Sequence, residues 1–458
     1  MNDSSGLTAT DSSSPAPGPR MVTVVFWLVV GLLGWSSLGP IWFQAIRPTQ
    51  GRVNDFYQDW GSARNYVTGA PVYSAHSWSV PRHLGLAKNP NATIEYNAHP
   101  PASVLLALPL AGLDFPDAVR AWNLLTLAGF LVALGLVVRG LGLGVRTVLA
   151  GVALLAYCHP VYGNVYQGQL TLLLVLLLVG AWVLDRSGRG ELAGVLIGVA
   201  AAIKLFPAYL FLIPATRRDP RPIVWGMTAF GLVNLVAVLV LGLDTYRDYL
   251  AIVLPDQSRF RSFGFNIAMA GFWYKLFDPA SETGLITPLY HSPAMARVGT
   301  LVSDVVVTAV VVIAVARGVG KRERDLSFGL AVVGMLLVSP VTWDFSLPLL
   351  IVPAAVLARE LLGRPWSLAL LVAAAVVAWI PQSLFMLMVG EPDGPASPAY
   401  MLGAPALKFY VLLTLFGLLA RDCLVRENSR GVAAESSPLQ PRRVGITLAS
   451  AQVGDGPR

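Results

Sequence analysis

The stretch MVTVVFWLVVGLLGWSSLGPIWFQAI, Met21–Ile46, holds 26 residues without one charged side chain. A helix needs about 20 consecutive apolar residues to cross the hydrocarbon core of a bilayer, so this run is long enough. Arg20 precedes the run, which is too long for the core of a signal peptide and lacks a clear cleavage site. It therefore predicts a retained first membrane helix.

The rest of the chain is similarly apolar. Hydrophobic residues make up 55% of the 458 residues and charged residues only 13%, with a mean hydropathy of +0.62. Soluble proteins carry about 25% charged residues. Apolar runs recur as far as residue 420, and the alternation of polar and apolar residues that marks an outer-membrane barrel is absent. These features predict an all-α polytopic membrane protein, not a soluble domain with one anchor.

Basic residues in the short loops predict how the helices are oriented. Most Arg and Lys residues fall on one side of the expected helices, which the positive-inside rule makes cytoplasmic. Reading residues 191–217 as one helix would place the later basic loops outside, so we expect two short helices with Lys204 between them. The result is about twelve crossings with both termini inside. The expected helices lie near residues 21–45, 118–138, 147–161, 169–185, 191–204, 206–217, 222–243, 296–317, 326–341, 344–361, 366–386 and 403–420.

Two long loops, near residues 46–117 and 244–295, then face the extracytoplasmic side. Residues 99–113 are apolar but short and Pro-rich, which predicts a helix lying at the outer surface or dipping into it. The polar ends, residues 1–20 and 421–458, are expected to be disordered and cytoplasmic, flanking a transmembrane domain over residues 21–420. No internal repeat is visible, which gives an inverted-repeat transporter little support.

The first long loop opens with two acids. In VNDFYQDWGSARNYVTGAPVY, residues 53–73, Asp55 and Asp59 are four positions apart, a spacing that puts both carboxylates on one face of a helix. A buried carboxylate at the outer membrane surface can act as a general base on a sugar hydroxyl. The alternatives are a solvated loop acid or a helix cap. The aromatic neighbours suit a sugar site, but they equally suit an interfacial belt.

Three further polar motifs fall on the expected outer side. His99 in EYNAHPP precedes two prolines, where it either binds a phosphate or hydroxyl or packs at the turn. Asn164 and Gln169 in NVYQGQ join two helices, as ligands of a sugar or phosphate or as capping amides. Trp343 and Asp344 lie in SPVTWDFS, where Asp344 pairs with a cation, orients a substrate or caps a helix. Polar function therefore concentrates on the extracytoplasmic side.

Cations near this side have similar alternatives. Lys204 lies among apolar residues near a helix end, where a charge must pair, snorkel or bind an anionic head group. Arg259 and Arg261 in the second long loop suit phosphate oxygens or anionic lipid, and Asn266 can hydrogen-bond a hydroxyl. The net charge of +7 is weak evidence for a nucleic-acid partner, because topology already explains it.

Several classes of chemistry lack their motifs in this chain. The sequence has no Walker A pattern, no GxSxG and no metal-ligand spacing, and Cys158 and Cys423 are too far apart in expected depth to form a bridge. Energy from nucleotide hydrolysis is therefore not expected. An outward-facing enzyme also has no pool of nucleotide sugars. It would need a donor carried in the membrane, and a lipid phosphate fits the cations and amides described above.

Five segments occur in an order that resembles a known family. They are DFYQDWGSARNYVTGAPVY, YNAHPPASVLLALPL, NVYQGQLTLLLVLLLVGAW, GVLIGVAAAIKLFPAYLF and LLVSPVTWDFSLPLLI, between Asp55 and about Pro348. Together they resemble glycosyltransferase family 87 of the GT-C class. This family includes polyprenyl-phosphate-mannose-dependent mannosyltransferases and the arabinofuranosyltransferases of mycobacterial envelope synthesis.

The resemblance implies a GT-C fold in which a lipid-phosphate sugar donor meets an acceptor at the outer membrane face. Asp55 matches the acid that opens the first outer loop, the expected base. Lys204 falls at the family's Ala-x-x-Lys-x-x-Pro position, and Asn164 and Gln169 at its Asn/Gly-Gln position. Departures bear on the donor sugar and the acceptor more than on the class. They are His99 for Tyr, Asn266-Ile267-Ala268 for an Asn-Gln-Ser pattern, and Asp344-Phe345 where many relatives have His after the Trp.

These observations favour an inverting, metal-independent glycosyltransferase of a bacterial plasma membrane, using no cofactor and no nucleic acid. It would move a mannose- or arabinofuranose-type sugar from a polyprenyl-phosphate donor to a glycolipid or glycan acceptor. Asp55 is the expected base; Lys204, Arg259 and Arg261 are expected on the donor phosphate; Asp59, His99, Asn164, Gln169, Asn266, Trp343 and Asp344 are expected to bind substrate. The alternatives are a transporter or flippase of lipid-linked sugars, which forms no glycosidic bond, and a non-catalytic membrane assembly partner.

Overall fold

The computed structural model describes residues 19–48, 51–87, 95–279, 286–361, 364–381, 384–385 and 395–424. The expected disordered ends therefore lie almost wholly outside the described residues. The first helix begins at Pro19, two residues before the expected start of the transmembrane domain. The last helix ends at Leu424, a few residues past its expected end.

The described part of the chain is helical, as predicted, with one isolated bridge between Ile286 and Ala396 as its only β-type pairing. The longer helices are α1 (Pro19–Ile46), α5 (Phe115–Leu141), α6 (Val145–Leu155), α8 (Thr171–Arg186), α9 (Gly190–Ile203), α11 (Arg221–Leu241), α15 (Pro293–Arg317), α16 (Lys321–Val338), α17 (Ile351–Leu361), α18 (Pro365–Trp379) and α21 (Leu407–Leu424). Shorter pieces are α2 (Phe56–Val67), α3 (His76–Leu84), α4 (Pro101–Ala107), η1 (Leu108–Leu110), α7 (His159–Gln167), η2 (Phe206–Phe211), α10 (Leu212–Thr216), α12 (Leu243–Asp248), η3 (Tyr249–Val253), α13 (Leu254–Asp256), η4 (Gln257–Ser262), α14 (Met269–Phe277), η6 (Asp344–Leu350), α20 (Pro398–Met401) and η7 (Ala404–Ala406).

Membrane-spanning potential is concentrated in a few of these helices. Among the described residues, five stretches are long and apolar enough to cross a bilayer, or six if the bent pair α6 and α7 is one span. They are Met21–Ile46, Phe115–Leu141, Arg221–Leu241, Pro293–Arg317 and Pro398–Leu424. Four other apolar stretches are shorter: Pro101–Leu110, Gly190–Ile203, Phe206–Thr216 and Pro365–Trp379. The expected number of about twelve crossings is thus not confirmed by length and composition.

Prolines account for two differences from the expected helices. The helix expected over residues 147–161 is instead α6 and α7, which meet at an angle of 53°. Helix α7 begins at His159, and Pro160 is its second residue. Proline has no N–H to donate to the preceding turn and its ring clashes with the carbonyl four residues earlier, so α6 cannot continue through it. The helix expected over residues 344–361 begins as the 3-10 helix η6, which contains Pro348, and becomes α-helical only at Ile351.

Close packing of α9 against α11 positions Lys204. A Cβ on Gly194 would lie 2.0 Å from the carbonyl oxygen of Pro222, and one on Gly198 would lie 2.0 Å from that of Gly226. Small residues four apart let two helix backbones approach in this way. Helix α9 ends at Ile203, and Lys204 has extended backbone angles (φ −142°, ψ 133°). The stretch 191–217 is therefore not one continuous helix, in agreement with the prediction.

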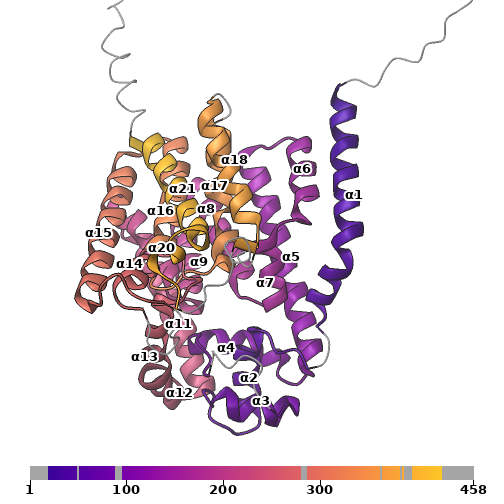
Figure 1. Cartoon of the computed structure of the whole chain (residues 1–458), viewed down its shortest axis with the longest axis vertical. Coiled ribbons are helices and arrows are strands. Elements are labelled where there is room, and N and C mark those ends of the chain that lie inside the picture. Colours follow the sequence, from indigo (N-terminus) through magenta and orange to yellow (C-terminus); the bar gives the residue numbers. More distant parts are fainter. Residues whose placement is uncertain are drawn as a thin grey trace, which may run out of the picture.

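Several elements of the two long loops gather at one end of the molecule. Figure 1 shows α2, α3 and α4 beside α12 and α13 at the lower end, whereas α1 starts and α21 finishes at the opposite end. The short helix predicted within residues 99–113 is α4 and η1, and α4 packs against α2, α9 and α11. Residues far apart in sequence therefore meet at the start of α2.

Candidate active site

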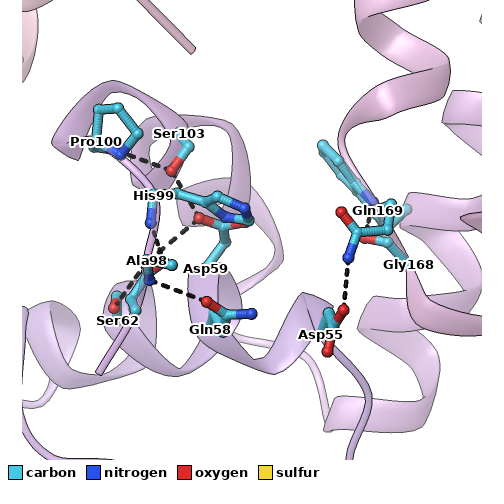
Figure 2. Close-up of polar contacts among 12 residues, drawn as sticks. Asp55, Gln58, Asp59, Ser62, Ala98, His99, Pro100, Ser103, Gly168 and Gln169 are labelled. Carbon is cyan, nitrogen blue, oxygen red and sulfur yellow. Dashed lines mark hydrogen bonds and ion pairs between the residues drawn. The ribbon is translucent and has the colours of Figure 1, made fainter. Parts of the chain in front are cut away.

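Asp55 lies at the start of α2, immediately before its first residue, Phe56. Its side chain is half-buried, and its Oδ2 accepts a hydrogen bond of 2.5 Å from Nε2 of Gln169 (Figure 2). Gln169 belongs to the loop between α7 and α8 and is itself 9% exposed. Two residues that the sequence marked separately are thus in direct contact.

The start of α2 is docked on this α7–α8 loop. Gly168 has a positive φ of 65°, and a Cβ there would lie 2.6 Å from the Cβ of Phe56. The Phe56 ring stacks on Trp122 with ring centres 5.0 Å apart, and the Trp122 indole N–H donates to the carbonyl of Gly168 at 2.9 Å. Glycine suits this position because it accepts the left-handed conformation and leaves room for the neighbouring chain. The Asp55 carboxylate is therefore held in place by α5 and the α7–α8 loop.

Asp59 lies one turn further along α2 in a different environment. The residue is only 2% exposed. Its carboxylate accepts hydrogen bonds from Ser103 Oγ at 2.6 Å and Asn97 Nδ2 at 3.3 Å, and it pairs with His99 Nδ1 at 2.8 Å. Figure 2 shows the two carboxylates of α2 directed at different partners. Asp59 thus orients the His99 ring, and its oxygens are largely occupied by protein donors.

These environments shift the pKa values of Asp55 and Asp59 in opposite directions. Burial raises the pKa of Asp55, against the opposing effects of the Gln169 hydrogen bond and the charges of His99 and Lys204. Burial alone would also raise the pKa of Asp59, but the attraction of His99 and the hydrogen bonds outweigh it, so the pKa lies below its usual value. Such a split separates a carboxyl that takes up a proton readily from one that stays charged.

Lys204 faces the same region from the end of α9. Its charge acts on both Asp55 and Asp59, yet in the described chain no carboxylate lies within 4.0 Å of its ammonium group. The cation is therefore close enough to influence the acids and is not neutralised by a direct ion pair. An anionic group entering between them would find an available positive charge.

Two of the predicted substrate ligands serve to join loops. The side chain of Asn164 donates to the carbonyls of Pro160 and Phe345, each at 2.8 Å. The amide N of Asn266 donates to the carbonyls of Arg261 and Pro340, while its oxygen accepts from the backbone N–H groups of Ala268 and Thr342 at 3.0 Å. Both amide N–H groups of each side chain are used in this way, although Oδ1 of Asn164 is buried without a partner. Both side chains thus organise the backbone around them.

The segment SPVTWDFS, residues 339–346 and called the Ser-Pro motif below, is also held by contacts within the protein. Asp344 pairs with Lys408 of α21 at 3.0 Å, and Lys408 is fully buried. Trp343 packs edge-on against Phe263 and Phe260, with ring centres 5.4 and 6.1 Å apart. The sequence analysis did not predict a role for Lys408. A lone lysine within the last apolar run does indicate a buried acidic partner, because an unpaired charge within the membrane is costly.

The arginines of the second long loop do not join Asp55. Arg259 pairs with Asp256 at 3.1 Å, and Arg261 donates to the hydroxyl of Tyr274 at 3.2 Å. Neither is among the charges that act on Asp55. The structure therefore brings together Asp55, Asp59, His99, Gln169 and Lys204, and it leaves Arg259 and Arg261 in a separate group. Ser103, Asn97 and Gln58, which accepts from the backbone N–H of Ala98 at 2.9 Å, complete the first group and were not predicted.

Within the described residues, no three His, Cys, Asp or Glu side chains form a group able to hold a metal ion. The fold and the site thus define an all-helical membrane protein with a polar centre built on a half-buried acid, a lysine and an oriented histidine. The chain belongs to glycosyltransferase family 87, whose profile matches residues 97–340, and it is therefore a membrane glycosyltransferase. The family resemblance predicted from the sequence is confirmed.

Two relatives of the chain are named as mannosyltransferases. The chain is 25% identical over 396 residues to the polyprenol-phosphate-mannose-dependent alpha-(1-2)-phosphatidylinositol mannoside mannosyltransferase of Mycobacterium tuberculosis, covering 81% of this chain and 86% of that protein. It is 28% identical over 298 residues to the corresponding pentamannoside mannosyltransferase of Mycolicibacterium smegmatis, covering 59% of this chain and 67% of that protein. No solved structure gives a significant match.

Proposed function

We propose that this protein transfers mannose from a polyprenyl-phosphate donor to a glycolipid acceptor at the extracytoplasmic membrane face. The two relatives named above support mannose over arabinofuranose, because both carry mannose in their donor and mannosyltransferase in their name. Their names also give a phosphatidylinositol mannoside as acceptor, and we propose an acceptor of this lipid class here. The distribution of basic loops in the sequence supports the outer face.

The observation that carries this proposal is the Asp55 carboxylate, half-buried and held by Gln169. Asp55 takes the proton from an acceptor hydroxyl. The freed oxygen forms a bond to the anomeric carbon of the donor sugar, while the bond from that carbon to the phosphate oxygen breaks and its electron pair leaves with the phosphate. Attack from the face opposite the phosphate inverts the anomeric centre. No metal takes part in this step, as expected for the GT-C class.

Lys204 and His99 are proposed to stabilise the leaving phosphate. Negative charge on the phosphate grows as the glycosidic bond to it breaks, so a cation positioned there stabilises the transition state more than the bound donor. Asp59 keeps the His99 ring oriented. Gln169 keeps Asp55 in place, and Asn164, Asn266, Trp343 and Asp344 support the surrounding loops. Arg259 and Arg261 are not part of this proposed phosphate site.

Transfer assays with purified wild type and Asp55→Asn test the proposal. We expect the variant to fold and bind polyprenyl-phosphate mannose but to transfer at least ~100-fold more slowly, the scale of general-base catalysis. Asp244→Asn is the matched control, because that side chain is 85% exposed. Equal transfer by wild type and Asp55→Asn would make Asp55 structural. Donor binding by wild type without transfer to any glycolipid would favour a transporter of lipid-linked sugars.

A further inference from the structure

A cavity lined by both charged and apolar residues lies apart from the Asp55 site. Its volume is about 340 Å³, and its lining includes Arg261, Tyr274, Arg297, Thr300, Leu301 and Asp304. These residues come from η4, α14 and α15, and neither Asp55 nor Lys204 is among the lining residues. The proposed transfer reaction leaves this cavity without a role.

Two arginines in the cavity make no close ion pair within the described residues, although Asp304 lines the same cavity. Arg261 donates to the Tyr274 hydroxyl at 3.2 Å and lies 5.7 Å from the centre of its ring. Arg297 is exposed, and across the described residues no carboxylate lies within 4.0 Å of either guanidinium group. The guanidinium fork matches the oxygens of a phosphate, so one phosphate can accept hydrogen bonds from both arginines.

Asp304 supplies an acceptor in the same cavity. It lies within Pro293–Arg317, one of the candidate membrane spans, and its Oδ1 is buried without a hydrogen-bond partner. An acid within a membrane helix is costly unless something pairs with it, and a carboxylate accepts hydrogen bonds only. The missing partner is therefore a donor. Neither Arg261 nor Arg297 forms an ion pair with Asp304 in the described structure, and a hydroxyl group on the phosphate-bearing ligand provides a donor.

The surface beside the cavity is apolar. Val298, Leu301, Val302 and Val305 of α15 are 56–64% exposed, and they fall between or next to Arg297 and Asp304 in the sequence. Such a face along a candidate membrane span suits a hydrocarbon chain. Charges that match a phosphate, an acceptor that matches a hydroxyl and an adjoining apolar helix face together describe a lipid.

We infer that this cavity binds an anionic lipid whose phosphate lies on Arg261 and Arg297 and whose head group donates a hydroxyl to Asp304. The acyl or prenyl chain lies along the exposed face of α15. Phosphatidylinositol has this chemistry and serves as the probe. The site is distinct from the transfer centre, so lipid binding does not require transfer activity.

Binding of phosphatidylinositol to the full chain, measured by native mass spectrometry on the Asp55→Asn background, tests the inference. The double variant Arg261→Gln/Arg297→Gln is expected to bind at least ~10-fold more weakly, as loss of charge-assisted bonds to phosphate implies. Asp304→Asn is expected to lose the preference for phosphatidylinositol over phosphatidic acid, whose head group has no inositol hydroxyls. Arg247→Gln is the control, because Arg247 is exposed and pairs with Asp244 at 2.5 Å.

A second variant separates binding from folding. Leu301→Trp keeps every charge but fills the cavity, and it is also expected to weaken phosphatidylinositol binding while its elution and melting temperature match those of wild type. Unchanged lipid binding by both the double arginine variant and Leu301→Trp would overturn the inference. Displacement of the lipid by an equal concentration of inorganic phosphate would also overturn it, since the site would then take a free anion.

Discussion

The two ends of the first turn of α2 carry the same chemical group in contrasting surroundings. Asp55 meets the α7–α8 loop through one hydrogen bond from Gln169, and burial raises its pKa. Asp59 meets the entry to α4 through His99, Ser103 and Asn97, which hold its pKa low. The same spacing therefore places two carboxylates in surroundings that shift their pKa values in opposite directions.

The second long loop shows a further use of similar residues. Its amide, Asn266, fastens the backbone of η4 to the Ser-Pro motif, and its arginines lie around a separate cavity or pair locally. Acids, amides and cations among aromatic residues therefore indicate a polar region at a membrane surface. Which of these side chains can contact a substrate depends on their hydrogen-bond and ion-pair partners in the folded chain. Four experiments test this contrast.

The largest effect is expected on stability, from Asp59→Asn. The Asp59 and His99 side chains are only 3% and 11% exposed, and removing one member of a buried pair costs about 3–5 kcal/mol of unfolding free energy. Thermal unfolding in detergent measures the loss. Because the pKa of Asp59 is low in the folded chain, its contribution exists above the usual carboxyl pKa and is lost as pH falls through the folded value. The variant and wild type should therefore converge in acid.

Asp117→Asn is the matched control for that experiment. Its side chain is 57% exposed and lies 4.0 Å from Arg47, so no measurable change is expected. If Asp59→Asn melts at the same temperature as Asp117→Asn, the Asp59 network is not a structural support and the contrast between the two acids fails.

Lys204→Met should give the next largest effect, a fall in transfer of about 100-fold, the scale observed when one group stabilising transition-state charge is removed. Lys204→Arg should recover part of the rate because it keeps the charge. Steady-state kinetics with polyprenyl-phosphate mannose measure both. The control is Lys321→Met at the exposed start of α16, and equal rates for the two methionine variants would remove Lys204 from the mechanism.

Gly168→Ala should slow transfer by roughly 10-fold, because small misplacements of a catalytic group have effects of this order or larger. The added Cβ meets Phe56 at 2.6 Å and shifts the start of α2. Gly69→Ala is the matched control, since Gly69 also has a positive φ, 76°, but has open space where its Cβ would lie. Both variants share the backbone strain, and only the first should change the transfer rate. Equal rates would mean that docking of α2 on the α7–α8 loop does not position Asp55.

The smallest expected effect is a shift in the pH profile of kcat/KM. Asp55 must be ionised to take a proton, so transfer falls as pH drops through its pKa, and burial places that fall at higher pH than for an exposed carboxyl. Gln169→Leu removes a hydrogen bond that lowers this pKa, so the fall should move to still higher pH. A profile identical in wild type and Gln169→Leu would show that the titrating group is not Asp55.

The sequence predicted the helical membrane class of structure and the family. Apolar runs such as Met21–Ile46 imply membrane helices because an unbonded backbone cannot remain in lipid. The order of five motifs led to the family, which the family profile confirms. The break between α6 and α7 and the 3-10 conformation of η6 were missed, since the apolar composition continues through Pro160 and Pro348 and hides the change in backbone.

Composition and local spacing determined that this chain is a helical membrane protein and that Asp55 and Asp59 share the start of one helix. Only the tertiary structure decided what each polar group does, because its partners come from distant positions: Gln169 for Asp55, His99 for Asp59 and Lys408 for Asp344. The charge state of a buried group depends on its partners and on its access to water. Neighbouring residues in the sequence specify neither the partners nor the access to water. The different environments of the two carboxylates therefore arise only when the chain is folded.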